Sequence, residues 1–338
     1  MKKLLSVILT LNLILIPLIT FSSCNTESES VNKNSDGISI VTTIFPYYEF
    51  ARNIAGNKAD VKLLLSPGSE PHSYEPSPSD IVAIENCDIF IYNGGESDEW
   101  VDSVLSSLQN NDMKIMKMMD YVTLLNEQSG EHSHDHEHEH EHSENEESHS
   151  HEEENDIEHS HGEGYDEHIW TSVRNAKELS AEIAHTLSEL DAENSDYYSE
   201  NENNYSLQLE KLDEEFTGIV NSSARNTVVF GDRFPFLYFV TDYELEYECA
   251  FPGCSSETEP SISTVTHMID FVKKEEIPTV FYLEFSNGKT AQLIAEDTGA
   301  DTMLFSSCHN VTKEQFESGV SYISLMEQNA TALKEALS

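Results

Sequence analysis

Two patterns of apolar positions alternate along most of this chain. Short runs rich in β-branched and aromatic residues are separated by longer stretches in which apolar residues recur at helical spacing. In the first half, the pattern predicts strands in SIVTTIF, DVKLLL, IFIYN and KIMKMM, and helices at about residues 46–55, 79–86, 100–108 and 172–190. In the second half, it predicts strands in TVVF, at 245–250, in TVFYLEF and in DTMLF, with helices that pass through Phe236 or begin at Ser261, Gly288 and Thr312. Because alternating strands and helices favour parallel sheets covered on both faces, we expect an α/β protein with two similar lobes.

A longer helical pattern lies between the two halves. Apolar residues recur there at spacings of three and four, with Glu and Lys between them, at Tyr205, Leu209, Leu212, Phe216 and Ile219. This spacing predicts one long amphipathic helix at 196–222, which joins an N-terminal lobe at 38–195 to a C-terminal lobe at 223–338. Ligands of open α/β sheets bind at the carboxyl ends of the strands, so candidate functional residues are sought where strands pass into loops.

The first 24 residues have the pattern of a secretory signal. Lys2 and Lys3 precede an apolar run at 4–21, which is followed by SSC ending at Cys24. Small residues before Cys24 predict a lipoprotein processing site at which this cysteine carries the lipid, and an uncleaved membrane anchor is the alternative. The polar, aperiodic segment 25–37 is predicted to be a tether. Either alternative places the folded part on the extracellular face of the cell membrane.

One tract consists almost entirely of His, Asp, Glu and Ser. It reads EHSHDHEHEHEHSENEESHSHEEENDIEHSH over residues 131–161, and it has too few apolar side chains to bury, so we expect a disordered His-rich loop at 127–164. Imidazole nitrogens and carboxylate oxygens at this density bind Zn²⁺ and related divalent metals. The alternative is an acidic solvated linker, but Glu alone would provide solubility. The tract therefore indicates that the protein binds a divalent metal.

The charge balance restricts the class of partner. The chain has 18 Lys and Arg residues against 63 Asp and Glu residues, a formal net charge of −45. Such a charge repels nucleic acid and anionic lipid and raises the local concentration of cations. We therefore expect no nucleic-acid partner.

Four cysteines remain after Cys24. Cys249 and Cys254 are too far apart for a CxxC metal site, so in an exported protein we expect a disulfide that involves one of them, with Cys308 as a candidate partner. Cys87 lies in the apolar run AIENCDIFIYN and is expected to be a buried thiol.

Two histidines outside the tract are candidate metal ligands. His72 follows a predicted strand in LLLSPGSEPHSYEPSPSD, a loop whose prolines reduce the entropy lost when it presents a side chain. His168 lies in YDEHIWTSVRNAKEL, where Asp166 can accept a hydrogen bond from the second ring nitrogen. A surface role for His72 and a continuation of the tract for His168 are the alternatives. His185 and His267 fall within predicted helices and are expected to be solvated.

Several segments resemble the solute-binding lipoproteins of zinc and manganese ABC importers. They are TTIFPYYEFARNIAG, PHSYEP, DEHIWTSVRNAKEL and ETEPSI, and the similarity extends over residues 38–337. The resemblance implies a receptor of the metal-binding periplasmic type, in which His72 and His168 bind the ion between two lobes joined by a rigid helix. It also implies an ABC transporter membrane permease as partner. Members thought to carry zinc often have a His-rich insertion before the second histidine, as here.

The remaining ligands depart from this family's pattern. The family usually has a third ligand in a motif like HDAF, whereas this chain has GDRF with Gly231 in the ligand's place, so Asp232 is the candidate substitute. An ion pair with Arg233 is the alternative role for Asp232. The fourth ligand is commonly an Asp after the last strand, where this chain has Ser307. His309, two residues later, is the candidate replacement because it follows DTMLF at the predicted crevice.

The donor set decides the expected metal. His72, His168 and His309 with one carboxylate form an N₃O set that suits Zn²⁺, whereas two imidazoles and two carboxylates would favour Mn²⁺. Glu284, at the end of TVFYLEF, is a candidate for a group behind the ligands or for a helix cap.

The resulting hypothesis is a monomeric, lipid-anchored receptor that captures Zn²⁺ and delivers it to a permease. A manganese receptor is the first alternative. An exported zinc-dependent hydrolase is the second, but the chain has no HExxH, no GxSxG and no recognisable triad, and a fourth protein ligand would close the metal to water. A metal buffer or adhesin that uses the exposed tract is the third.

Overall fold

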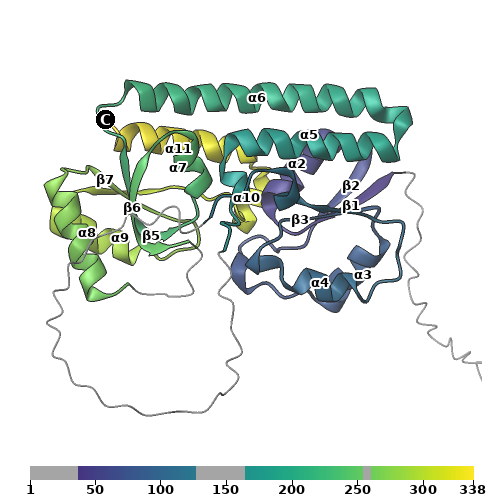
Figure 1. Ribbon diagram of the computed structural model, residues 1–338, viewed down its shortest axis with the longest axis horizontal. Helices are drawn as coiled ribbons and strands as arrows, with labels where there is room; N and C mark the ends of the chain where they lie inside the picture. Colours follow the sequence, from purple (N-terminus) through teal and green to yellow (C-terminus); the bar gives the residue numbers. More distant parts are fainter. Residues whose placement is uncertain (1–36, 127–163, 254–259) are drawn as a thin grey trace, which may run out of the picture. The chain divides into compact units, whose positions relative to one another are not determined.

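The computed structural model describes residues 37–126, 164–253 and 260–338 (Figure 1). The predicted signal with Cys24, the tether apart from Gly37, the His-rich tract and Cys254 lie outside these residues and stay predictions. Among the helices of the described ranges, none is long and apolar enough to cross a membrane.

Two parallel sheets of four strands form the framework. The N-terminal sheet contains β1 (Ile38–Thr42), β2 (Ala59–Leu63), β3 (Ile89–Tyr92) and β4 (Lys114–Lys117) in the order β2-β1-β3-β4. The C-terminal sheet contains β5 (Thr227–Phe234), β6 (Glu246–Pro252), β7 (Thr279–Tyr282) and β8 (Asp301–Leu304) in the equivalent order β6-β5-β7-β8. The predicted fold class of two similar α/β lobes is therefore confirmed.

Helices follow the strands in both lobes. The N-terminal sheet is flanked by α2 (Phe45–Ala55), α3 (Pro78–Asn86) and α4 (Trp100–Leu105), and the C-terminal sheet by α7 (Leu237–Asp242), α8 (Ile262–Lys274) and α9 (Lys289–Thr298). The short helix α10 (Lys313–Ser318) contacts α2 instead, through Phe316 and Tyr48. Single turns of 3₁₀ helix occur at η1 (Pro71–Ser73), η2 (Glu96–Asp98), η3 (Met118–Tyr121), η5 (Ile169–Thr171) and η6 (Ala192–Asn194). Two of these turns, η1 and η5, carry or adjoin candidate ligands.

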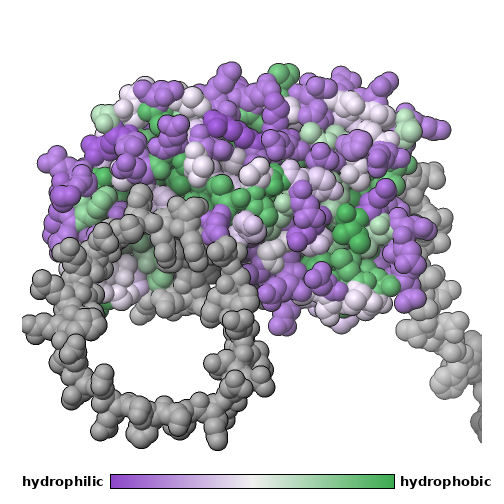
Figure 2. Space-filling model, viewed as in Figure 1, coloured by the Kyte–Doolittle hydropathy of each residue, from purple (hydrophilic) through white to green (hydrophobic). Residues whose placement is uncertain are grey.

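A layer of three long helices connects the lobes. The helix α6 (Ser195–Ser222) packs against α2, α5 (Val173–Leu190) and α11 (Tyr322–Ala336), and it runs across both lobes in Figure 1. All five residues of the predicted apolar stripe on α6 are buried. The upper edge of Figure 2, where α6 lies in Figure 1, is mostly hydrophilic. One hydrophobic cluster extends from α2 through α5 and α6 to α11, so the two lobes share a continuous core.

The last predicted helix is in fact two helices. The helix α10 ends at Gly319, which has a φ of +75° and donates its backbone N–H to carbonyls of the preceding turn. Ser321 then caps α11 by accepting the N–H of Ser324 at 3.1 Å. The stop signal and the new cap are both visible in GVSYIS, which the prediction of one helix from Thr312 did not use.

Among the pairings left open for the expected disulfide, that of Cys249 with Cys308 is wrong. Both are free thiols, and they belong to opposite edges of the C-terminal sheet, since Cys249 lies on β6 and Cys308 follows β8. Three strand spacings separate these edges, about 14 Å, whereas the Cα atoms of a disulfide lie within about 7 Å. Cys87 is a buried thiol, as expected, and its Sγ lies 3.2 Å from the carbonyl oxygen of Ile84.

The turn after β3 is held by a buried carboxyl group. Asp98 Oδ2 accepts the backbone N–H groups of Asn93 at 2.8 Å and Gly94 at 3.0 Å. Burial is the largest influence on this group, and it raises the pKa of Asp98 to about 7 in spite of those two hydrogen bonds.

Asp98→Asn should flatten the pH dependence of stability. A carboxyl whose pKa is raised by folding contributes stability that is fully present below the unfolded pKa, about 4, and is lost as the pH rises through about 7. The Asn amide keeps an oxygen for the two N–H donors but has no charge to bury. Between pH 5 and 8, we expect the free energy of unfolding in urea to fall by about 2–3 kcal/mol less in this variant than in the wild type.

The exposed Asp60 on β2 supplies the control, because Asp60→Asn should leave the wild-type pH profile unchanged. Parallel profiles for Asp98→Asn and the wild type would contradict the assignment.

Candidate metal centre

Three histidines from distant parts of the chain meet at one point. His72 lies in η1 after β2, His168 immediately precedes η5, and His309 follows β8. One ligand atom from each ring can be chosen so that all three lie within 4.8 Å of one another, and no other such group of His, Cys, Asp and Glu is present in the described ranges. Ring centroids are 5.2–6.0 Å apart. A metal at about 2.0–2.1 Å from each nitrogen fits this spacing after a small contraction.

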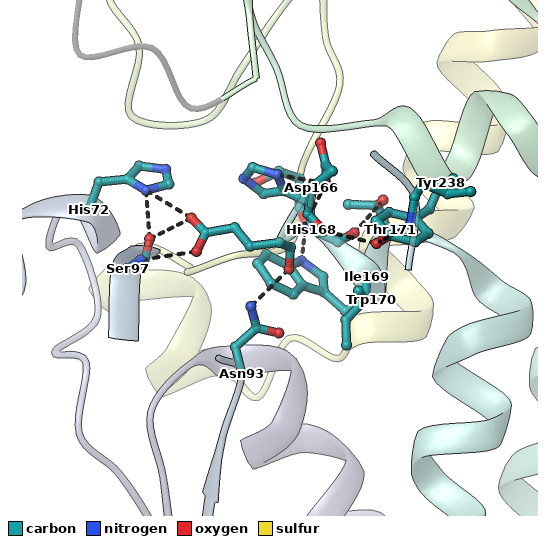
Figure 3. A network of polar contacts seen from close by, with 12 residues as sticks. His72, Asn93, Ser97, Asp166, His168, Ile169, Trp170, Thr171 and Tyr238 are labelled. Atoms are coloured by element: carbon teal, nitrogen blue, oxygen red, sulfur yellow. Dashed lines mark hydrogen bonds and ion pairs between the residues drawn. The ribbon is translucent and has the colours of Figure 1, made fainter. Parts of the chain in front are cut away.

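His168 is held rigidly from two directions. Its Nδ1 lies 3.2 Å from Asp166 Oδ1, and its backbone N–H donates to the same oxygen at 2.8 Å. The backbone carbonyl of Asp166 in turn accepts the hydroxyl of Tyr238 at 2.8 Å, and the ring of His168 packs against Trp170 (Figure 3). With Nδ1 on the carboxylate, Nε2 is the nitrogen that can bind a metal. Asp166 therefore takes the orienting position that its place in the sequence suggested.

His309 is positioned by contacts between the C-terminal loop and the N-terminal lobe. Trp170 Nε1 donates to the carbonyl of Ser307 at 2.8 Å, and the backbone N–H of Phe45 donates to the carbonyl of His309 at 3.3 Å. The ring of His309 lies 4.6 Å from that of Trp170, centroid to centroid. Cys308 has a φ of +59°, an uncommon conformation for a residue with a side chain, which this tightly held loop maintains.

The three histidines differ in exposure, and their surroundings disfavour the protonated form of His72 and His309. The side chain of His72 is 25% exposed, whereas His168 and His309 are buried. Burial lowers the pKa of His72, and the neighbouring His168 lowers it further. Burial likewise holds the pKa of His309 well below its usual value, with His72, His168 and Arg233 adding to the effect. Both rings are thus kept neutral, the form that binds metal.

A small cavity lies among the rings. Its volume is about 30 Å³, enough for an ion and little else, and the charged or ligating side chains that line it are those of Glu70, His72, His168, Arg233, Glu284 and His309. Arg233 extends from β5, and its guanidinium lies 3.4 Å from Glu70 Oε1 in the loop after β2. The cavity is therefore bordered by an ion pair between the two lobes.

The structure does not bring Asp232 into this group. Its Oδ1 accepts the backbone N–H of Arg233 at 2.9 Å, and its Oδ2 accepts that of Leu283 at 3.3 Å, so the carboxylate joins the ends of β5 and β7. Arg233 pairs with Glu70 instead. At Gly231, an added Cβ would lie 2.5 Å from the Cα of Ala291 in α9, which leaves no room for a ligand side chain on that strand position.

Glu284 supports the loop that carries His309. Its carboxylate accepts both the backbone N–H of Ser307, at 2.8 Å, and the hydroxyl of the same residue. Burial raises the pKa of Glu284, while the hydrogen bonds from Ser307 act in the opposite direction. Of the two roles considered for Glu284 from the sequence, this geometry matches a group behind a ligand. Ser307, at the position where the resemblance implies an Asp ligand, is therefore a hydrogen-bond donor to Glu284.

The other two candidate histidines lie on helix surfaces. His185 on α5 is 68% exposed beside Glu189, and His267 on α8 is 49% exposed beside Glu248. Both have the solvated positions expected of them.

Trp170→Phe should destabilise the fold by removing a bond between the lobes. The change leaves the buried carbonyl of Ser307 without its donor and leaves part of the indole volume empty, so we expect a loss of about 2–4 kcal/mol in the free energy of unfolding. Urea unfolding monitored by far-UV circular dichroism measures it.

Trp100→Phe is the control for loss of an indole N–H, since the buried Nε1 of the partly buried Trp100 has no hydrogen-bond partner among the described residues. Its loss should be smaller by at least about 1 kcal/mol. Equal losses in the two variants would show that the bond to Ser307 contributes nothing.

Comparison with known proteins agrees with this geometry. A family model described as ZnuA, zinc-uptake complex component A periplasmic, matches residues 40–336. The high-affinity zinc uptake system protein ZnuA of Bacillus subtilis is 28% identical over 318 residues, which cover 94% of this chain and 93% of that protein. The zinc-binding lipoprotein AdcA of Streptococcus pneumoniae is 31% identical over 310 residues, 90% of this chain but only 57% of the relative.

Solved structures show the same architecture. The crystal structure of the Zn(II)-bound ZnuA-like domain of Streptococcus pneumoniae AdcA superimposes with a TM-score of 0.70 at 27% identity, covering 89% of this chain and 99% of that domain. The metal-dependent lipoprotein YcdH of Bacillus subtilis gives a TM-score of 0.71 at 25% identity, with 89% and 100% covered.

Proposed function

Because this chain belongs to the family of zinc-uptake complex component A, we propose that it is the solute receptor of an ABC importer and binds one Zn²⁺ between its lobes. The observation that carries the proposal is the meeting of His72, His168 and His309, from loops of both sheets, around a cavity of about 30 Å³. A cavity of this size accommodates a bare ion and excludes amino acids, sugars and other organic solutes.

The donor set favours zinc. Three neutral imidazoles are borderline-soft nitrogen donors, which suit Zn²⁺, whereas Mn²⁺ is better served by carboxylate oxygens. The two carboxylates that line the cavity are both engaged, Glu70 by Arg233 and Glu284 by Ser307. The names of the relatives ZnuA and AdcA point to the same metal.

The interactions that occupy these two carboxylates also argue against a zinc-dependent hydrolase. Catalytic zinc also has three protein ligands, but hydrolysis needs a general base that reaches a metal-bound water. Glu284 is fixed by two hydrogen bonds to Ser307, and Glu70 is paired with Arg233. The family consists of receptors of uptake systems, and a receptor requires only binding and release.

The receptor would act outside the cytoplasm, as the family description states, and would deliver the ion to a membrane permease. We further propose that Cys24 carries a lipid that holds the protein on the extracellular face of the membrane, and that the folded part acts as a monomer. The signal-like sequence before Cys24 supports the anchor.

Alanine substitution of any ligand should weaken zinc binding strongly. We expect His72→Ala, His168→Ala and His309→Ala each to reduce affinity by more than about 100-fold, because loss of a mere hydrogen-bond partner of a ligand typically costs about 10–100-fold. Calorimetry against a competing chelator, which keeps weak sites on the His-rich tract empty, measures the tight site.

The controls are His185→Ala and His267→Ala, which remove exposed helix histidines and should retain wild-type affinity. Retention of tight zinc binding by the double variant His72→Ala, His168→Ala would refute the proposed site.

His309→Asp should shift the selectivity of the site toward manganese. The change replaces one imidazole by a carboxylate, and harder oxygen donors suit Mn²⁺ better than nitrogen donors do. We expect the ratio of zinc affinity to manganese affinity to fall at least tenfold relative to the wild type. Competition titrations in chelator-buffered Zn²⁺ and Mn²⁺ give both affinities. An unchanged ratio would show that His309 does not contact the metal, and metal-edge anomalous diffraction would then identify the true neighbours.

A further inference from the structure

A chain of polar contacts runs from His72 to the residue before His168. His72 Nδ1 lies 3.0 Å from Ser97 Oγ, and Ser97 Oγ donates to Glu167 Oε1 (Figure 3). The backbone N–H of Ser97 also donates to Glu167 Oε2, at 3.0 Å. His72 Nδ1 is itself 3.6 Å from Glu167 Oε1, too long for a direct hydrogen bond. The serine hydroxyl is therefore the bridge between the ring and the carboxylate.

The carboxylate of Glu167 determines the direction of both hydrogen bonds in this series of contacts. A carboxylate only accepts, so the single proton of the Ser97 hydroxyl is committed to Glu167. The hydroxyl oxygen can then only accept from the ring, which requires a proton on Nδ1 of His72. A neutral imidazole with Nδ1 protonated has its lone pair on Nε2. We propose that Glu167 is a positioning residue that, through Ser97, selects this tautomer of His72.

The surroundings of Glu167 hold it for this role. Its side chain is buried, and its backbone carbonyl accepts the amide of Asn93 at 2.8 Å. The carboxylate lies against Gly95, where an added Cβ would be 2.7 Å from Oε2 and 2.8 Å from the Cβ of Glu167. Gly95 has a φ of +82°, so the turn after β3 requires glycine both for its conformation and for this close approach.

The groups behind His72 are arranged differently from those behind His168, and this difference makes the proposed role of Glu167 testable. Asp166 contacts the ring of His168 directly, so only a change of the carboxylate itself can alter that contact. At His72 the hydroxyl of Ser97 lies between, and a hydroxyl can reverse its direction. A change at Glu167 can therefore invert the tautomer of a ring to which Glu167 makes no direct hydrogen bond.

Glu167→Gln is the decisive variant because it keeps the shape of the side chain. The amide oxygen should replace Oε2, which accepts the backbone N–H of Ser97, so that the amide nitrogen faces Ser97 Oγ. This nitrogen donates to the hydroxyl, which then donates to His72 Nδ1 and places the ring proton on Nε2. We expect zinc affinity of the full chain, measured against a competing chelator, to fall about 10–100-fold.

Nitrogen NMR of the metal-free protein gives an independent readout. The signals of His72 are identified by their loss in His72→Ala, and their ¹⁵N shifts report which ring nitrogen carries the proton. We expect protonated Nδ1 in the wild type and protonated Nε2 in Glu167→Gln. Because this experiment needs no metal, it tests the inference even if zinc is not the ligand. Failure of the proposed function would instead appear as absent tight binding by the wild type, so the two failures are distinguishable.

Removal of the hydroxyl should rescue the defect. The double variant Ser97→Ala, Glu167→Gln lacks the hydroxyl that would donate to His72 Nδ1, and the position of Oε1 lies 3.6 Å from that nitrogen, beyond hydrogen-bond distance. Its affinity should therefore exceed that of Glu167→Gln and match that of Ser97→Ala. Glu214→Gln on the exposed face of α6 is the control and should bind as the wild type does. Wild-type affinity in Glu167→Gln, an unchanged His72 tautomer, or losses that add in the double variant would each overturn the proposal.

Discussion

Three imidazole rings can gather around one small cavity, two of them buried, only if they remain uncharged, and this requirement governs the rest of the site. Burial and the mutual proximity of the rings lower the pKa of His72 and hold that of His309 well below its usual value. Each ring also needs its lone pair directed at the cavity, which demands a hydrogen-bond acceptor at the opposite nitrogen. Asp166 and the pair Ser97 and Glu167 meet that demand for two of the rings. The neighbouring acidic groups are therefore understood as orienting groups behind the histidines.

Much of the fold was predictable because its signals are local. Alternation of apolar runs with helical spacing identified both sheets, and the stripe from Tyr205 to Ile219 identified α6. His72 and His168 were found from a proline-framed loop, from the Asp166 neighbour and from a family resemblance. His309 was placed at the cavity because it follows a strand, and the carboxyl ends of parallel strands share one edge of a sheet. The prediction that these three histidines lie together therefore did not depend on knowing the direction of each side chain.

The parts that were not predictable depend on directions and distances. Asp232 follows Gly231 at the end of β5, where the register of the sheet shifts between Phe230 and Arg233, and a single strand's sequence does not reveal such a shift. The shift leaves Asp232 on backbone N–H groups and aims Arg233 at the cavity. The cysteine pairing could not be predicted for a related reason, since strand order decides that Cys249 and Cys308 belong to opposite edges of the sheet.

The same geometry explains why the proposed site takes no ligand from β5. The helix α9 approaches β5 so closely that Gly231 has no space for a Cβ, and this approach is part of the packing of the C-terminal lobe. In the proposed site the ligand would then come from another strand end, and the loop after β8 brings His309 to the cavity. That loop can take this role because it is anchored twice, by Glu284 within its own lobe and by Trp170 from the other side of the cleft.

Release of a bound ion must be compatible with a core that does not open. One hydrophobic cluster extends through α2, α5, α6 and α11, so wide separation of the lobes would expose apolar surface at a cost of about 25 cal/mol per Å². His168 and His309 are buried in rigid surroundings and are poorly placed to move. His72 is the most exposed of the three and sits on a 3₁₀ turn outside the sheets. Of the three rings, His72 is therefore the one whose withdrawal would leave the shared core intact.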